Sequence, residues 1–98
     1  MTRQEIIARL QARAEDIRAL GADALFLFGS AARDEMRADS DIDVFIDRRP
    51  NFDFRFTHLT DLQSLLEEEL ERPVDLGTRG GLHPRLKERI ERSAVRVF

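Results

Sequence analysis

Two short apolar runs constrain the fold of this chain more than any other feature. The first, residues 24–28, is uninterrupted and stops at Gly29, a pattern typical of a strand buried on both faces. The second, residues 42–46, holds one charged residue, Asp43, inside an otherwise apolar segment and predicts another strand. We expect residues 30–36 to form a short helix between them.

Longer helices are predicted around these two runs. Apolar residues recur at helical spacing over residues 3–20 and over residues 55–71. Pro84 suits the first turn of a third helix, in which we expect Leu86 and Ile90 to be buried.

The order of the elements favours one fold class. Residues 73–76 predict a short strand, and residues 95–98 a terminal one. Helices and strands then alternate along the chain, which indicates an α/β fold with a small mixed sheet of about three or four strands and flanking helices. A chain of 98 residues suits one domain, residues 1–98.

Composition and charge exclude some classes of protein. The formal net charge is -3, which argues against a broad basic face that binds nucleic acid directly. The chain has no cysteine and therefore no disulfide framework. No apolar run approaches the roughly 20 residues of a membrane helix, and the polar N-terminus is unlike a signal peptide. We expect a cytoplasmic protein that does not associate with membranes.

Three aspartates follow a pattern that indicates metal binding. Asp41 and Asp43 are two residues apart, so on a strand they point to the same face. Two carboxylates at this spacing repel each other unless a cation lies between them, and oxygen ligands suit Mg2+ or Mn2+. Asp75 repeats the pattern in the strand 73–76. Three acids on adjacent strands predict a two-metal site.

The residues after the first strand are suited to phosphate. Gly29 lets the backbone approach a ligand closely, and Ser30 opens a helix whose N–H groups face outward. If Gly29 and Asp41 line one site, the first two strands are antiparallel. The third strand then runs parallel to the second, with residues 55–71 as the crossover helix.

Arg33 and Ser40 each have two interpretations. Arg33 either contacts phosphate or forms a surface ion pair with Asp34, Glu35 or Asp39. Ser40 either assists there or shapes the turn into the second strand.

The arrangement Gly29-Ser30, ten residues, then Asp41-Ile42-Asp43 resembles the signature of the DNA-polymerase-β-like nucleotidyltransferases. Its local form is similar to the minimal nucleotidyltransferase (MNT) proteins, and the resemblance spans almost the whole chain. The matching segments are residues 28–33, 40–43, 73–76 and 90–95.

The resemblance implies a fold, an activity and a partner. MNT proteins have the polymerase-β-like fold and are commonly encoded beside a HEPN-domain protein. In characterised pairs the HEPN protein is a ribonuclease toxin, and the MNT antitoxin transfers AMP from ATP to a toxin tyrosine. We therefore expect a nucleoside triphosphate and a HEPN toxin as partners, in a complex with the toxin.

The resemblance also implies residue roles. Asp41 and Asp43 would bind two Mg2+ ions, with Mn2+ as the alternative metal. Asp75 would bind the catalytic metal and orient or deprotonate the acceptor hydroxyl. The residues that would hold the nucleotide are Gly29 and Ser30, at the outer phosphates, with Arg33 and Ser40 assisting.

Two other functions stay open at this point. A non-catalytic binding module would neutralise its partner by complex formation, an idea that the small size and the phenylalanines at 52, 54 and 56 motivate. Those rings are expected in a packed loop or in an exposed patch for a partner. Alternatively, the chain is the catalytic subunit of a split transferase acting on a small molecule or nucleic acid. His58 and His83 lie outside any motif and are expected in capping or surface positions.

Overall fold

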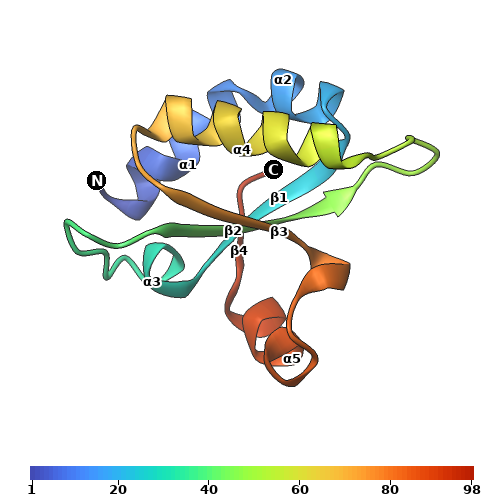
Figure 1. Cartoon of the computed structure of the whole chain (residues 1–98). Coiled ribbons are helices and arrows are strands. Elements are labelled where there is room, and N and C mark those ends of the chain that lie inside the picture. The colour runs from blue at the N-terminus through green and yellow to red at the C-terminus, as the bar shows by residue number, and fades with distance from the viewer.

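The computed structural model describes residues 1–98 as a four-stranded mixed sheet with helices on both sides (Figure 1). The strands are β1 (Ala22–Phe28), β2 (Ile42–Arg48), β3 (Val74–Thr78) and β4 (Val95–Arg96). The helices are α1 (Arg3–Ala12), α2 (Ala14–Ala19), α3 (Gly29–Ala32), α4 (Phe56–Leu70), the 3-10 helix η1 (Arg79–Gly81) and α5 (Pro84–Ser93).

The side chains along each strand point alternately to the two faces of the sheet, and the two faces have different surroundings. In β2, Ile42, Val44 and Ile46 are fully buried and belong to the main hydrophobic core, together with residues of α1, α2 and α4. Asp43 and Phe45 point to the opposite face, since side chains alternate along a strand. Figure 1 shows α1, α2 and α4 on one face of the sheet and α5 on the other. None of these helices is long and apolar enough to cross a lipid bilayer.

The topology agrees with the prediction from the sequence. The strand order is β3-β2-β1-β4. β1 pairs with β2 in antiparallel orientation, and β2 pairs with β3 in parallel orientation. α4 provides the crossover that a parallel pair requires. β4 adds an antiparallel partner at the other side of β1, so the expected α/β fold with a small mixed sheet is confirmed.

Two predicted helices are shorter than expected. The helix over residues 3–20 is divided at Arg13, whose backbone (φ -106°, ψ 13°) leaves the helical region and closes α1. The division lets Ile17 pack into the same core as the α1 side chains. The helix over residues 30–36 ends at Ala32, because Asp34 has a left-handed backbone (φ 58°) that stops propagation.

The predictions for β3 and β1 also need correction. β3 extends to Thr78, because Gly77 and Thr78 pair with β2 where a loop was expected. In β1, Leu25 and Leu27 are fully buried on the face covered by the helices, whereas Phe26 on the other face is only half-buried.

The burial predicted for α5 is wrong. No residue of α5 is buried, Leu86 is 41% exposed and Ile90 is half-buried. The apolar i, i+4 pair is typical of a core face, but α5 lies on the face of the sheet opposite α1, α2 and α4, so none of these three helices covers it (Figure 1).

This difference in burial predicts unequal effects of two leucine truncations. Leu66→Ala in α4 removes a fully buried side chain and is expected to lower the free energy of unfolding by about 2–5 kcal/mol. Leu86→Ala in α5 is expected to change it by less than about 1 kcal/mol, because the side chain remains accessible to water. Urea denaturation of both variants measures the difference, and equal losses would contradict the exposed position of α5.

Candidate active site

The strand register brings the predicted acids to one end of the sheet. Asp43 lies directly across from Asp75 on β3 and across from Phe28 on β1. Gly29 follows Phe28, and Asp41 lies two residues before Asp43, immediately ahead of β2. Gly29, Asp41, Asp43 and Asp75 therefore lie at the same end of the three paired strands.

Among the acids at this end of the sheet, Asp43 has the carboxyl group that its surroundings affect most. It is half-buried, and burial raises the pKa of its carboxyl group above the ordinary value. The negative charges of Asp75 and Asp41 raise this pKa further, and the positive charge of Arg33 lowers it. The positive charge of Arg33 is therefore not enough to stabilise the ionised form of Asp43. A bound cation would provide the missing positive charge.

The three carboxylates suit a hard divalent cation in their chemistry. All the donors are oxygens, which Mg2+ and Mn2+ prefer, and none of the three acids is in an ion pair within the chain. The side chains are not drawn together, since no three acidic or histidine groups lie close enough to hold an ion as they stand. Asp41 and Asp75 are exposed, so only Asp43 is constrained by its surroundings.

Gly29 contacts the Asp43 carboxylate because it has no side chain. Its backbone is left-handed (φ 67°), a conformation that favours glycine. A β-carbon at this position would overlap Oδ2 of Asp43. Ser30 follows in the first turn of α3 and is half-buried, so the chain passes directly from β1 into a helix beside Asp43.

Arg33 and Ser40, the two residues with two interpretations each, have different positions relative to Asp43. Arg33 lines a cavity together with Gly29 and Asp43, while its guanidinium also pairs with Glu35 at 3.2 Å on the surface. The Ser40 hydroxyl accepts a hydrogen bond from the backbone N–H of Arg37 at 2.9 Å. Ser40 therefore shapes the turn before Asp41, and of these two residues only Arg33 lines the cavity beside Asp43.

A cavity of about 210 Å³ lies between this end of the sheet and α5. One wall comes from the residues around Gly29 and the other from α5. The lining residues are Phe28, Gly29, Arg33, Asp43, Leu86, Arg89, Ile90 and Ser93. The sequence prediction missed the contribution of α5, although the apolar i, i+4 pair and the arginine beside it were visible there.

Arg72 is a second residue that sequence reasoning missed. Its Nη2 donates hydrogen bonds to the backbone carbonyls of Arg37, Ala38 and Ser40 at 2.8, 3.1 and 2.7 Å. These bonds hold the loop that leads directly into Asp41. Nothing in the local sequence signals this role, because the partners are more than 30 residues away.

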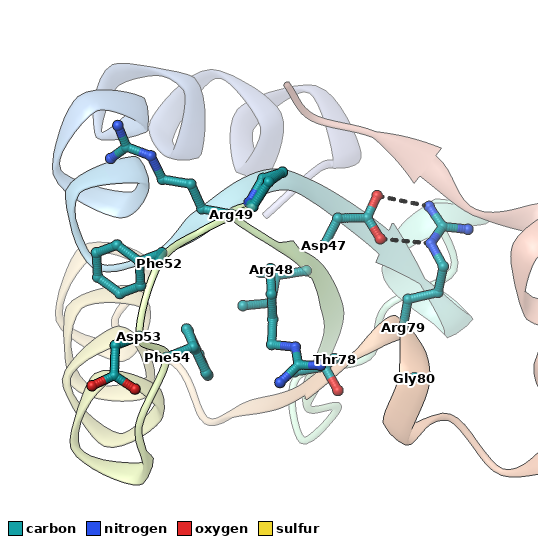
Figure 2. A pocket seen from close by; sticks show the side chains of 11 residues that line it. Asp47, Arg48, Arg49, Phe52, Asp53, Phe54, Thr78, Arg79 and Gly80 are labelled. Carbon is teal, nitrogen blue, oxygen red and sulfur yellow. Dashed lines mark hydrogen bonds and ion pairs between the residues drawn. The ribbon is translucent and has the colours of Figure 1, made fainter.

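A larger cavity of about 580 Å³ lies at the other end of β2 (Figure 2). The ion pair between Asp47 and Arg79 forms part of its wall, and Asp47 is about 13 Å along the strand from Asp43. Phe52 and Phe54 also line it, from a packed loop. Phe56 alone among the three predicted rings is strongly exposed, at 76%.

The two histidines have the capping positions expected of them. His58 Nδ1 accepts a hydrogen bond from the backbone N–H of Arg55 at 3.0 Å. His83 Nδ1 accepts one from the backbone N–H of Arg85 at 3.2 Å. Both stabilise helix starts and lie outside the cavity lined by Asp43.

Comparison with known proteins places this chain in a family. A family model described as "Nucleotidyltransferase domain" matches residues 7–97. The chain is 39% identical over 72 residues to a Methanocaldococcus jannaschii protein named "Putative protein adenylyltransferase MJ0435", covering 74% of this chain and 75% of that protein. A second protein of that organism, with the same name except for its number, MJ1379, is 36% identical over 76% of this chain and 75% of its own length.

Solved structures show the same fold. A structure titled "Structure of putative minimal nucleotidyltransferase" superposes with a TM-score of 0.83 at 33% identity, covering 97% of this chain and 95% of that one. A Shewanella oneidensis structure, described as a tri-AMPylated HEPN toxin in complex with MNT antitoxin, gives a TM-score of 0.64 at 16% identity, covering 99% and 72%. At that identity the likeness concerns the fold alone. The resemblance drawn from Gly29, Ser30 and the aspartates is confirmed, and the chain belongs to the nucleotidyltransferase domain family.

Proposed function

We propose that this nucleotidyltransferase transfers AMP from ATP to a hydroxyl group of a HEPN-domain toxin, with tyrosine as the acceptor, and thereby acts as its antitoxin. The observation that carries the proposal is the register pair Asp43 and Asp75 with Gly29 against the Asp43 carboxylate. The names of the Methanocaldococcus jannaschii relatives support protein adenylylation. The description of the Shewanella oneidensis complex supports the kind of partner.

The chemistry assigns a role to each acid. The acceptor oxygen forms a bond to the α-phosphorus of ATP, the bond from that phosphorus to the bridging oxygen of the β-phosphate breaks, and pyrophosphate leaves. The proton of the acceptor hydroxyl passes to a carboxylate, and we assign this step to Asp75, which is exposed. Asp41, Asp43 and Asp75 would hold two Mg2+ ions, or Mn2+, which would offset the phosphate charge.

The remaining residues bind the nucleotide. The backbone at Gly29 and Ser30 approaches the outer phosphates, since no side chain intervenes at Gly29. Arg33 lies at the same cavity and adds a positive charge, whereas Ser40 contributes through the turn that it stabilises. ATP is a cytoplasmic metabolite, which fits the location expected from the sequence.

The direct test is transfer of label from ATP to the partner. The native chain, Mg2+ and ATP labelled at the α-phosphate are incubated with the HEPN-domain protein produced from the neighbouring gene. We expect label on a tyrosine of that protein, located by peptide mass spectrometry. Absence of label, with both proteins folded and in complex, would reject protein adenylylation.

The non-catalytic alternative predicts a different dose dependence. A binding module must match its partner in amount, whereas an enzyme neutralises an excess. The Asp41→Asn/Asp43→Asn variant, expressed at a level well below the toxin, is expected to give no protection. Full protection by this variant at that level would favour neutralisation by complex formation.

A further inference from the structure

α5 forms one wall of the cavity beside Asp43, yet its own packing does not fix its position. It contributes Leu86, Arg89, Ile90 and Ser93 to the lining, and none of its side chains is buried. Helices in globular proteins are usually held by burial of an apolar face. The position of α5 over the cavity must therefore depend on other interactions.

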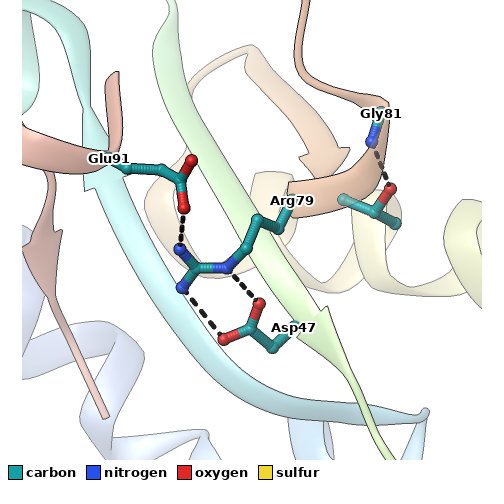
Figure 3. A network of polar contacts seen from close by, with 5 residues as sticks. Asp47, Arg79, Gly81 and Glu91 are labelled. Atoms are coloured by element: carbon teal, nitrogen blue, oxygen red, sulfur yellow. Dashed lines mark hydrogen bonds and ion pairs between the residues drawn. The ribbon is translucent and has the colours of Figure 1, made fainter. Parts of the chain in front are cut away.

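A polar network joins α5 to the sheet (Figure 3). We call the side chains of Asp47, Arg79 and Glu91 the Arg79 network. Arg79 donates from Nε and Nη2 to the two carboxylate oxygens of Asp47, at 2.6 and 3.1 Å. Its Nη1 donates to Oε2 of Glu91 on α5 at 2.6 Å. The three side chains are each about two-thirds buried, with exposures of 31–33%.

Two aromatic rings lie beside the Arg79 guanidinium and limit its movement. The group lies 4.9 Å from the centre of the Phe26 ring and 5.2 Å from that of Phe45. The two rings stack on each other at 4.9 Å with an interplanar angle of 14°. A guanidinium held by a bidentate carboxylate on a ring surface has little rotational freedom. The direction in which Arg79 presents Nη1 to Glu91 is therefore set by the sheet.

The Arg79 network links two elements that contribute to the walls of the cavity beside Asp43, namely β2 and α5. Asp47 and Asp43 are on the same strand and the same face of β2. Glu91 is adjacent to Ile90 and two residues from Arg89, which both line the cavity. A shift of Glu91 relative to β2 thus changes the distance between the α5 wall and Asp43.

We propose that Arg79 is a positioning residue that holds α5, through Glu91, at the distance from β2 that nucleotide binding requires. The proposal rests on the proposed function, because it concerns the same nucleotide site. Arg79 does not line the cavity beside Asp43, so it acts through α5. Loss of the link frees α5 without exposing the main core, because no residue of that core comes from α5 and the ends of α5 remain attached to η1 and β4.

Glu91→Gln tests the link, and Glu88→Gln is its matched control. Glu88 is on the same helix but pairs only with Arg92, at 3.9 Å and with both side chains more than 70% exposed. We expect Glu91→Gln to accelerate amide hydrogen exchange of residues 84–93 about tenfold. We expect the KM for ATP to rise about fivefold, with kcat within about twofold and the melting temperature unchanged. Glu88→Gln should leave all four quantities unchanged.

Arg79→Lys is the second variant. A lysine keeps the positive charge but cannot form the bidentate pair with Asp47, so the same changes in hydrogen exchange and in KM are expected as for Glu91→Gln. Unchanged exchange in residues 84–93 together with an unchanged KM in both variants would overturn the proposal, as would equal effects from Glu88→Gln.

A nucleotide-binding measurement separates this proposal from the proposed function. The affinity for α,β-methylene-ATP with Mg2+ is measured by calorimetry, which needs no transfer to a partner. Weaker binding by Glu91→Gln supports the role of Arg79 even if the native chain labels no toxin, an outcome that would reject adenylylation alone. A native chain that does not bind the analogue would overturn both.

Discussion

Replacement of Asp43 by Asn is expected to lower the rate of AMP transfer by about a thousandfold or more, since it removes the central carboxylate of the proposed metal site. Asp43 is the one acid of the three that is held between two strands, opposite Asp75 and against Gly29. Transfer of label from ATP to the partner, measured at saturating Mg2+, gives the rate.

The same substitution is expected to stabilise the fold. Burial, and then the charges of Asp75 and Asp41, raise the pKa of Asp43 in the folded state. An acid whose pKa is higher in the folded state disfavours folding once it ionises, so the penalty appears as the pH rises above the unfolded value of about 3.9. Asp43→Asn should therefore melt at a higher temperature than the native chain at pH 7, with the difference vanishing below that pH.

Two controls make this result specific. Asp39→Asn changes an exposed acid two residues before Asp41 and is expected to alter neither rate nor melting temperature. Mg2+ should raise the melting temperature of the native chain, by binding the folded state, and have little effect on Asp43→Asn. Retention of transfer and of Mg2+ stabilisation in Asp43→Asn would rule out this acid as a metal ligand.

Replacement of Gly29 by Ala is expected to impair both folding and transfer. The left-handed backbone of Gly29 costs about 1–2 kcal/mol for a residue with a β-carbon. That carbon would also displace the Asp43 carboxylate. We expect a fall of several degrees in melting temperature and a loss of about a hundredfold or more in transfer, because a shift of about 1 Å at reacting groups has that effect.

Gly77→Ala is the matched control for this prediction. Gly77 lies in β3 two residues after Asp75, and a β-carbon there would meet no atom within 4 Å. Calorimetric melting and the transfer assay should show Gly77→Ala close to the native chain or slightly more stable, by about 0.5–1 kcal/mol. Equal behaviour of the two alanine variants would remove the argument for close contact at Gly29.

Part of the fold and site could be predicted because their signals are local. The apolar runs at 24–28 and 42–46, each next to a glycine or an aspartate, predicted two strands and the end of the sheet at which Gly29 and the aspartates lie. The i, i+2 spacing of Asp41 and Asp43 is enough to predict that two carboxylates share one face of a strand.

The division between α1 and α2 and the early end of α3 depended on single backbone conformations, at Arg13 and at Asp34. Such conformations have weak sequence signals, because a non-glycine residue adopts them only where its surroundings favour them. The burial of α5 was mispredicted for a related reason: an amphipathic pattern shows which face is apolar but not what covers it.

By itself, the sequence determined the family, the α/β order of elements and which acids to propose for the site. Only the tertiary structure decided that Asp75 lies across from Asp43, that Arg72 holds the loop before Asp41, and that Arg79 joins α5 to the sheet. The physical reason is sequence separation. Motif residues act through spacing along one strand or turn, whereas these contacts join groups 12 to 35 residues apart and exist only once the strands have paired.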